Sequence, residues 1–129
     1  MVQSSIVIGL GFGDEGKGIT TDYLCTQSKN ALVIRFSGGH QAGHTVVNEA
    51  GVRHIFSSFG AGTLRDMPSY WSRFCTLSPI AFYNELQALL KAGFTPKIYI
   101  DALTMITTPF DILYNRNTEK TNQHGSCGL

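Results

Sequence analysis

The feature that most constrains this chain is a glycine-rich loop that directly follows its first apolar run. The run Ser5–Ile8 is rich in β-branched residues and ends at Gly9, which predicts a buried strand of a parallel sheet. The loop Gly11–Gly18 comes next and fits the pattern G-x-x-x-x-G-K. In that pattern, successive backbone N–H groups bind phosphate oxygens at the start of a helix. The sequence therefore predicts a phosphate-binding loop between a strand and a helix.

The last position of the pattern departs from the usual phosphate loop. Gly18 stands where a hydroxyl residue would hold Mg²⁺, although Lys17 still supplies a positive charge beside a bound phosphate. A hard cation needs anionic oxygen ligands, and the nearest ones are the carboxylates of Asp14 and Glu15 inside the loop. The alternative is a tight strand-to-helix turn whose acidic side chains are only solvated.

The residues around this loop predict a βαβ unit. A helix is expected from Ile19 to about Cys25, with Asp22 facing outward and Tyr23 and Leu24 facing the sheet. The continuous apolar run Ala31–Phe36 predicts the next strand. A strand, a helix and a strand within ~30 residues are typical of parallel strands joined by a right-handed crossover.

Three further elements are indicated later in the chain. The segments Thr45–Val47 and Val52–Phe56 flank a turn with a glycine and predict a β-hairpin. A helix should begin after Ser78, which can cap it, and end before Gly93. Lys97–Ile100 predicts another strand. The expected apolar stripe of the helix consists of Phe82, Leu86, Leu89 and Leu90. Together these elements predict an α/β, P-loop-like fold, with a mainly parallel sheet flanked by helices and a hairpin insertion.

A second loop, rich in glycine and histidine, follows the predicted strand 31–36. The loop Ser37–Thr45 should lie at the same carboxyl end of the sheet as the first loop, where open α/β sheets bind their ligands. An imidazole at this place, from His40 or His44, could donate a proton to a transferred phosphate. Two alternatives stay open: histidines that only make structural hydrogen bonds, and a zinc site, for which no third ligand lies at suitable spacing.

Composition limits the partners that the chain can bind. Ten Lys and Arg residues against nine Asp and Glu residues give a net charge of +1, so neither nucleic acid nor a membrane is expected as a partner. The apolar runs are far shorter than the ~20 residues of a membrane-spanning helix. Cys25, Cys75 and Cys127 are odd in number and lack CxxC spacing, which favours reduced thiols and a cytoplasmic protein.

The two loops together resemble those of one enzyme family. The motif GDEGKG at Gly13–Gly18, followed by GGHQAGHT at Gly38–Thr45, is similar to the adenylosuccinate synthetases of purine nucleotide biosynthesis. The likeness covers the whole chain, strongly to Thr45 and weakly after Ile100. Family members are considerably longer, so residues 1–129 are expected to form the N-terminal portion of a GTP-dependent synthetase domain, incomplete at its C-terminus.

The resemblance implies a ligase. Members of the family join IMP and L-aspartate with hydrolysis of GTP, through a 6-phosphoryl-IMP intermediate, and use Mg²⁺ as cofactor. A homodimer in the cytoplasm is the expected form. The 129 residues alone are expected to be inactive, because the family's segments for guanine and aspartate recognition lie beyond Leu129.

The roles of the family's residues transfer to this sequence position by position. Asp14 matches the catalytic base that takes the N1 proton of the purine and also binds Mg²⁺, and His44 matches the acid that assists phosphoryl transfer. The Gly43 carbonyl matches a second metal ligand. The positions that match GTP and phosphate contacts are Gly13, Asp14, Glu15, Gly16, Lys17, Gly18, Gly43, His44 and Thr45. The positions that match IMP contacts are Asp14, Lys17, Gln41, Ala42, Gly43, His44 and Gly125.

Departures from the family pattern leave the substrate open. Gln41 replaces an asparagine that contacts IMP, Gly125 stands where a threonine is usual, and Leu10–Phe12 replaces a threonine-glutamine-tryptophan sequence. A divergent synthetase acting on a different purine nucleotide is therefore an alternative. A related phage group makes a 2-amino purine analogue, but it typically carries serine at the position of Asp14, which argues against that variant.

Two alternatives belong to other functional classes. A non-catalytic nucleotide- or phosphate-binding module would keep the first loop without the chemistry. The substitution Asp14→Asn separates the two, because a ligase would lose turnover whereas a binding module would bind anions at least as well. The other alternative is a P-loop phosphotransferase of another family. The missing hydroxyl after Lys17 and the histidine-containing loop both count against it.

Overall fold

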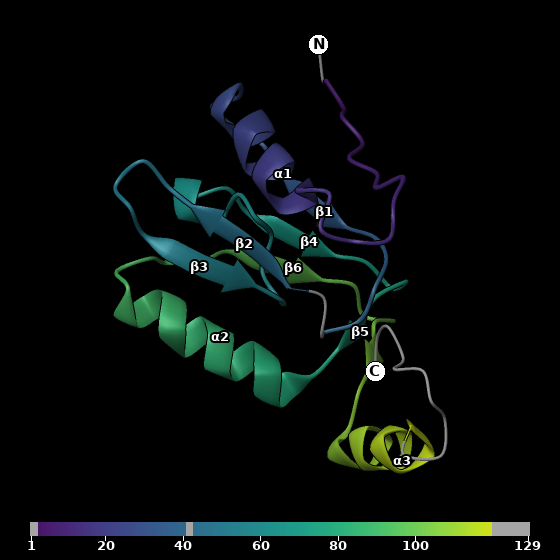
Figure 1. Ribbon diagram of the computed structural model, residues 1–129. Coiled ribbons are helices and arrows are strands. Elements are labelled where there is room, and N and C mark those ends of the chain that lie inside the picture. Colours follow the sequence, from purple (N-terminus) through teal and green to yellow (C-terminus); the bar gives the residue numbers. More distant parts are fainter. Residues whose placement is uncertain (1–2, 41–42, 120–129) are drawn as a thin grey trace.

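The computed structural model describes residues 3–40 and 43–119, and Figure 1 shows how their helices and strands are arranged. The elements in chain order are α1 (Lys17–Thr26), β1 (Val33–Arg35), β2 (His44–Val47), β3 (Arg53–Phe56), the short 3₁₀ helix η1 (Thr63–Arg65), β4 (Ser69–Trp71), β5 (Thr76–Leu77), α2 (Pro79–Lys91), β6 (Ile98–Ile100), β7 (Met105–Ile106) and α3 (Pro109–Glu119). Within the described residues, no helix has both the length and the apolar character that crossing a membrane requires.

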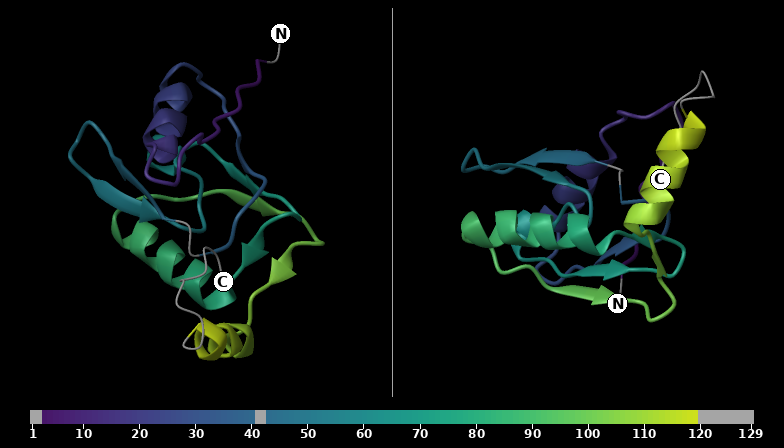
Figure 2. Two further views of the ribbon diagram at one scale, coloured as in Figure 1. Left: turned by 45° about the vertical axis from the view of Figure 1, so that its right-hand side comes forward. Right: turned by 90° about the horizontal axis from the view of Figure 1, so that it is seen from below.

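The strands confirm the predicted α/β architecture. β1, β4 and β6 form a parallel sheet in that order, and β5 and β7 form a short parallel pair. β2 and β3 form the predicted antiparallel hairpin, in which His44 lies opposite Phe56. Figure 2 shows the hairpin and the parallel sheet as two layers, with α2 running alongside both.

The main core lies between the hairpin, α2 and the parallel sheet. The hairpin contributes Val46 and Phe56 and α2 contributes Leu89, and each of these side chains is at most 1% exposed. Ile98 of β6 packs against this cluster and also against a second one around Trp71. Full burial of one such side chain stabilises by about 1.5–3 kcal/mol. Apolar contact therefore holds the hairpin and α2 on the sheet.

Local signals in the sequence explain where α2 begins and ends. The Ser78 hydroxyl accepts a hydrogen bond from the Ala81 N–H at 3.4 Å, and Pro79 stands in the first turn, where its missing N–H is not needed. Gly93 follows the helix with a φ of 88°, a conformation that glycine adopts readily. The predicted boundaries of this helix are confirmed.

The apolar stripe of α2 is confirmed for three of its four residues. Leu89 is fully buried, and Phe82 and Leu86 pack against the core. Leu90, in contrast, is 45% exposed, and the fourth inward position is taken by Glu85, which is 7% exposed. A helix face is limited in width, so a residue next to Leu89 in sequence turns away from the core.

The predicted first strand does not form. Residues 5–8 have no regular secondary structure, and Ile6 and Ile8 are 82% and 65% exposed. A β-branched run becomes a strand only when a neighbouring strand pairs with it, and none of the described strands does so. The segment instead runs beside α1 (Figure 1). Of the predicted βαβ unit, only the helix and the second strand are present.

α1 forms close to its predicted place but buries a different face. Asp22, predicted to face outward, is 6% exposed, whereas Tyr23, predicted to face the sheet, is 60% exposed. An ion pair explains the difference, because Arg65 of η1 donates from Nε and Nη2 to the Asp22 carboxylate, both at 2.9 Å. α1 thus packs mainly on β2 and η1.

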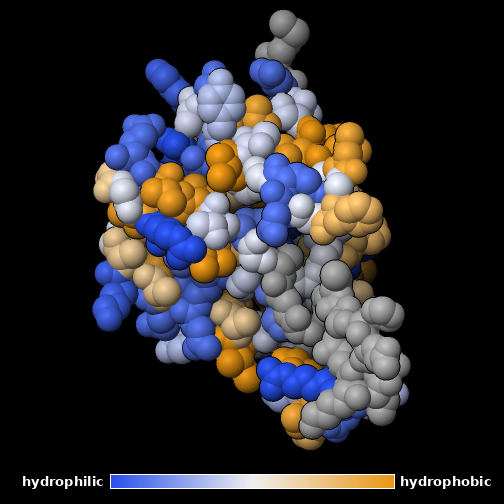
Figure 3. Space-filling view, in the orientation of Figure 1, coloured by the Kyte–Doolittle hydropathy of each residue, from blue (hydrophilic) through white to orange (hydrophobic). Residues whose placement is uncertain are grey.

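One face of the parallel sheet is open in the described part of the chain. Ile34 of β1 and Tyr99 of β6 are 59% and 60% exposed. Leu10 and Phe12 also have exposed side chains, and Figure 3 shows hydrophobic residues at the surface among hydrophilic ones. Burial in this structure is therefore concentrated on the side of the sheet that faces the hairpin.

Candidate functional site

The first loop makes a tight turn before α1. Gly13 has a φ of 112°, and Gly16, the N-cap residue of α1, has a φ of 76°. Asp14 between them also has a positive φ, 56°, which aspartate tolerates better than most residues. Asp14 is exposed, so the turn presents its carboxylate at the surface, where a ligand can reach it.

The Glu15 carboxylate occupies the centre of this loop. Its Oε1 accepts hydrogen bonds from the N–H groups of Gly11 and Gly13 at 3.0 and 3.1 Å. Its Oε2 is paired with Lys17 Nζ. The hydrogen bond from Lys17, followed by that from the Gly13 N–H, lowers the pKa of Glu15 to about 2. The loop therefore directs N–H groups and a lysine towards one anion, and in this structure the anion is Glu15.

A cleft lies beside this carboxylate. It has a volume of about 280 Å³ and is bounded by residues 6–8 of the N-terminal segment, by Glu15 and Lys17, and by Thr20 and Leu24 of α1. A β-carbon placed on Gly9 would lie only 2.7 Å from both Glu15 Oε2 and Lys17 Nζ. Glycine at this position thus lets the backbone approach the charged pair closely.

Gly18 joins the two predicted loops. A β-carbon placed on Gly18 would lie 2.7 Å from Cβ and 3.4 Å from Cγ of His44, and real Cβ contacts essentially never fall below 3.0 Å. Only glycine therefore lets the first turn of α1 pack on the start of β2. The departure from the usual phosphate-loop pattern at Gly18 therefore has a steric explanation, because the side chain of a hydroxyl residue would collide with His44.

His44 is half-buried at the start of β2. Burial lowers the pKa of His44 below its ordinary value, and the positive charges of Arg35 and Lys17 lower it further. The lowered pKa favours the neutral form of the imidazole at pH 7. An arriving phosphate would counter both charges and favour the protonated imidazole, which is the form that can act as a general acid.

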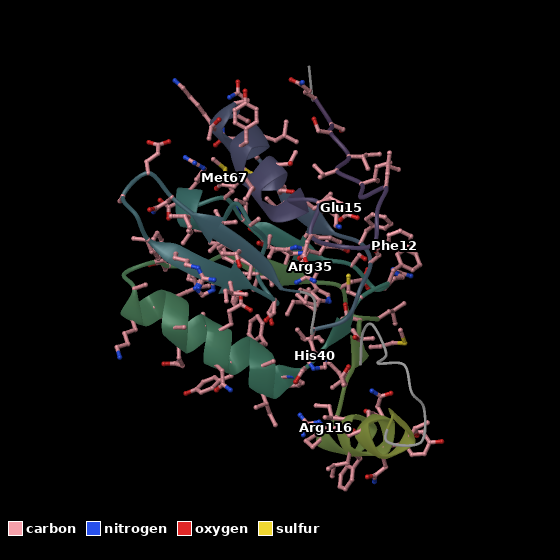
Figure 4. All side chains as sticks on the ribbon, in the orientation of Figure 1. Phe12, Glu15, Arg35, His40, Met67 and Arg116 are labelled. Carbon is pink, nitrogen blue, oxygen red and sulfur yellow. The ribbon has the colours of Figure 1, made fainter. Side chains whose placement is uncertain are left out.

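Arg35 is a site residue that the sequence pattern did not reveal. Its guanidinium lies 4.4 Å from the ring centroid of Trp71 and donates from Nη1 to the Ser57 carbonyl. Burial lowers the pKa of Arg35, although arginine stays charged in proteins. Figure 4 shows this side chain in the middle of the molecule, whereas Phe12 points outward. The sequence did hold one signal for Arg35, because it is the one charged residue in the apolar run Ala31–Phe36.

The remaining predicted site residues divide into two groups. Gly43 and Thr45 are described and exposed, next to His44, and Thr45 pairs with Ile55 of β3. The predicted IMP-contacting residues Gln41, Ala42 and Gly125 lie outside the described residues.

His40, the other histidine of the second loop, has a different environment. It is 8% exposed, burial lowers its pKa, and its Nδ1 has no hydrogen-bond partner among the described residues. The described residues hold no group of three His, Cys, Asp or Glu side chains suited to a metal ion, so they form no histidine-based zinc site. Cys25 and Cys75 are buried free thiols as predicted, and Cys127 lies outside the described residues.

Comparison with known sequences points to a single family. The family model described as adenylosuccinate synthetase matches residues 6–129. The adenylosuccinate synthetase of Picrophilus torridus is 32% identical over 124 residues, which are 96% of this chain and 29% of that protein. That of Burkholderia mallei is 32% identical over 129 residues, 98% of this chain and 28% of that protein. The chain thus spans less than a third of the length of these relatives.

Comparison with solved structures supports the fold. The fully ligated adenylosuccinate synthetase of Plasmodium falciparum superposes with a TM-score of 0.67 at 22% identity, over 87% of this chain and 27% of that one. The cyanophage S-2L succinoaminodeoxyadenylate synthetase, bound to dGMP and dATP, gives a TM-score of 0.65 at 18% identity, over 87% and 30% of the two chains. With the paired loops and the match over residues 6–129, these findings show that the chain belongs to the adenylosuccinate synthetase family.

Proposed function

We propose that the protein at its native length is a GTP-dependent C–N ligase of AMP biosynthesis. It joins IMP and L-aspartate, with GTP hydrolysis, through a 6-phosphoryl-IMP intermediate. The observation that carries this proposal is the packing of Gly18 on His44, which brings the phosphate loop and the second loop into one site. Residues 1–129 are the N-terminal portion of the synthetase domain in this proposal, in keeping with the 28–29% of the relatives' length that the chain spans.

The residues of the two loops have complementary tasks in the proposed reaction. Asp14 takes the proton from N1 of the purine, which raises the electron density on O6 and makes this oxygen nucleophilic towards the γ-phosphate of GTP. His44, protonated once phosphate is bound, donates to the phosphoryl oxygens. Lys17 and the loop N–H groups stabilise the negative charge that spreads over those oxygens.

Binding of nucleotide involves more residues of both loops. A phosphate that uses the N–H groups of Gly11 and Gly13 must displace the Glu15 carboxylate from them. The proposed GTP and phosphate contacts are Gly13, Asp14, Glu15, Gly16, Lys17, Gly18, Gly43, His44 and Thr45. Glu15 contributes through its main chain in this proposal, because its carboxylate competes with the phosphate. The proposed IMP contacts are Asp14, Lys17, Gln41, Ala42, Gly43, His44 and Gly125.

The donor set fits a magnesium ion. Mg²⁺ in phosphate-transfer sites is usually held by one or two carboxylates together with substrate phosphates and water. The exposed Asp14 carboxylate and the Gly43 carbonyl, from the two loops, supply oxygen ligands of this kind. The bound ion would neutralise phosphate charge during transfer. A cytoplasmic homodimer that binds neither nucleic acid nor membranes is part of the same proposal.

The substitution Asp14→Asn tests the proposal on the native-length protein. Wild type should convert IMP, L-aspartate and GTP to condensed product and GDP, and Asp14→Asn should bind GTP but lose turnover. Asp66→Asn is a matched control, because Asp66 is also exposed and also has a positive φ, 58°. Wild-type turnover in Asp14→Asn would contradict the role of this carboxylate. Inactive wild type, with Asp14→Asn binding anions as tightly or more tightly, would favour the binding module. The 129-residue chain alone should be inactive.

The second candidate function is the same ligase reaction on a different purine nucleotide. The solved cyanophage S-2L protein is bound to dGMP, and Gln41 replaces the family's asparagine at an IMP contact. Asp14, where the phage group typically carries serine, counts against this candidate. The same assay run in parallel with IMP and with dGMP decides between them. A higher kcat/KM with dGMP would identify a divergent synthetase that acts on a 2-amino purine nucleotide.

A further inference from the structure

Glu85 is a buried carboxylate that the proposed reaction does not use. It lies in the middle of α2 and is 7% exposed, four residues before the core residue Leu89. Removing a carboxylate from water is costly unless strong hydrogen bonds or opposite charges replace the lost hydration. A carboxylate in this position therefore points to a specific set of partners.

Most of those partners belong to the loop that leaves the hairpin, and a further one is His54 of β3, whose Nε2 lies 3.5 Å from Glu85 Oε1. Glu85 Oε2 accepts from the Ser58 N–H at 2.6 Å and from the Ser57 hydroxyl at 2.8 Å. The Ser57 N–H lies 3.2 and 3.1 Å from the two carboxylate oxygens, and the Phe59 N–H lies 3.3 Å from Oε1. Three successive N–H groups thus converge on one carboxylate, which fixes the path of the backbone over residues 57–59.

This loop is directly connected to the catalytic histidine. Residue 57 follows Phe56, which lies opposite His44 in the hairpin. The Ser57 carbonyl accepts the hydrogen bond from Arg35. Ser57 is therefore held on two sides, by the Glu85 carboxylate at its N–H and hydroxyl and by the Arg35 guanidinium at its carbonyl.

The charges of the two groups are opposite and both are inside the protein. Burial lowers the pKa of Arg35, and the negative charge of Glu85 opposes this shift. The Arg35 guanidinium also lies over the ring of Trp71, which is fully buried and helps to fix it. Glu85, residues 57–59 and Arg35 form one connected arrangement that reaches from α2 to β1.

We propose that Glu85 is a positioning residue for phosphoryl transfer: by clamping residues 57–59 it fixes the Arg35 guanidinium and the hairpin end that holds His44. This inference rests on the proposed function, since it concerns the rate of that reaction. Glu85 touches neither nucleotide nor metal in this scheme. Its removal should therefore slow the chemical step and leave nucleotide affinity nearly intact.

The experiment compares variants of the native-length protein. Glu85→Gln keeps the size of the side chain but removes its charge and turns an amide N–H₂ group towards N–H donors. Glu85→Asp keeps the charge on a side chain that is one methylene shorter. Gln87→Ala, at an exposed position of the same helix, is the surface control, and Leu89→Ala is a destabilised control in the core.

Two readouts separate positioning from general loss of structure. The first is steady-state kinetics: kcat of Glu85→Gln should fall about 10- to 100-fold, the scale expected for a misplacement near 1 Å, with KM for GTP nearly unchanged. Glu85→Asp should recover part of this loss. The second is the ¹⁵N NMR spectrum of the Arg35 guanidinium, whose N–H signals should be protected from exchange in wild type and Gln87→Ala and lost in Glu85→Gln.

Each result decides the inference. A folded Glu85→Gln protein with wild-type kcat and protected Arg35 signals would overturn it. A second pair of results would also overturn it. In that case Leu89→Ala shows the same kcat loss at the same unfolding free energy, and the Arg35 signals stay protected in both Leu89→Ala and Glu85→Gln. If Glu85→Gln does not fold, Glu85→Asp is held to the same two readouts. Inactive wild type would defeat the proposed function, whereas the Arg35 spectra would still decide whether Glu85 fixes the guanidinium.

Discussion

Gly18 and His44 are in contact at a point where a single methyl group does not fit. A β-carbon on Gly18 would lie 2.7 Å from His44 Cβ, so the backbone of α1 rests directly on the histidine side chain. This contact joins the phosphate loop to the start of β2. The geometry of the site thus depends on the absence of a side chain at one position.

The substitution Gly18→Ala tests this contact by the sign of its effect on stability. In a helix, glycine to alanine normally stabilises by about 1 kcal/mol. Here the collision with His44 should reverse the sign and destabilise by about 1–3 kcal/mol, as overpacking does. Urea unfolding gives the difference, and the neighbouring Ile19→Ala, at a residue that is 63% exposed, is the control. A more stable Gly18→Ala protein would show that the two elements do not touch.

Removing the Glu15 charge should strengthen binding of GTP. In this structure the carboxylate occupies the N–H groups and the lysine that a phosphate would use. Because its pKa is lowered to about 2, it is ionised at every pH where the protein would be assayed. Glu15→Gln should lower the Kd for GTP measured by calorimetry, whereas Glu49→Gln, whose carboxylate contacts Arg65, should not. A weaker complex would mean that Glu15 assists the nucleotide instead of competing with it.

Stability should fall as the pH drops below about 6.5, the ordinary pKa of histidine. Burial lowers the pKa of His44 and of His40, so both bind protons more readily in the unfolded chain. Protonation therefore favours unfolding, and the stability present above pH 6.5 is lost as the pH falls towards the native pKa values. Thermal unfolding at pH 7.5 and pH 5.5 measures this loss. The double variant His40→Gln/His44→Gln should lose less stability between these pH values than wild type. An equal loss in both proteins would assign the effect to other groups.

The ion pair between Asp22 and Arg65 should stabilise the attachment of α1. Both hydrogen bonds of the pair are 2.9 Å, and Asp22 is buried. Asp22→Asn should lower the free energy of unfolding by about 2 kcal/mol, the range for hydrogen bonds to a charged group. Asp66→Asn, an exposed position close to the same arginine in sequence, should change little. Equal unfolding curves for the two variants would mean that the pair contributes nothing to stability.

Elements with local signals were predictable from the sequence. α2 has a capping serine, a proline in its first turn and a glycine after its end, and the hairpin has alternating residues around a turn. α3 had such a signal too, which was missed: the Thr108 N–H and hydroxyl both donate to Asp111 Oδ2 at 2.7 Å across the first turn. This pairing is a capping box, readable as threonine followed three residues later by an acid.

Features that depend on distant partners were not predictable. The run Ser5–Ile8 has the composition of a strand, but strands need a partner, and composition does not say whether one is present. Asp22 has the character of a surface residue and is buried only because Arg65, 43 residues later, reaches it. The candidate site residues in the glycine loops were predicted from their motifs and stay predictions. Arg35 and Glu85 contact main-chain atoms of another segment, and such contacts leave no motif.

The hairpin strand β2 presents His44 and seals the core with neighbouring residues. His44 and Val46 are two positions apart and face the same side of the strand, and Val46 is 1% exposed. A substitution that changes the packing of the core at Val46 should therefore also shift the imidazole of His44, two residues away on the same side of the strand. In an evolving lineage this strand should have little freedom to change, because the same four residues contribute to the core through Val46 and to the proposed chemistry through His44.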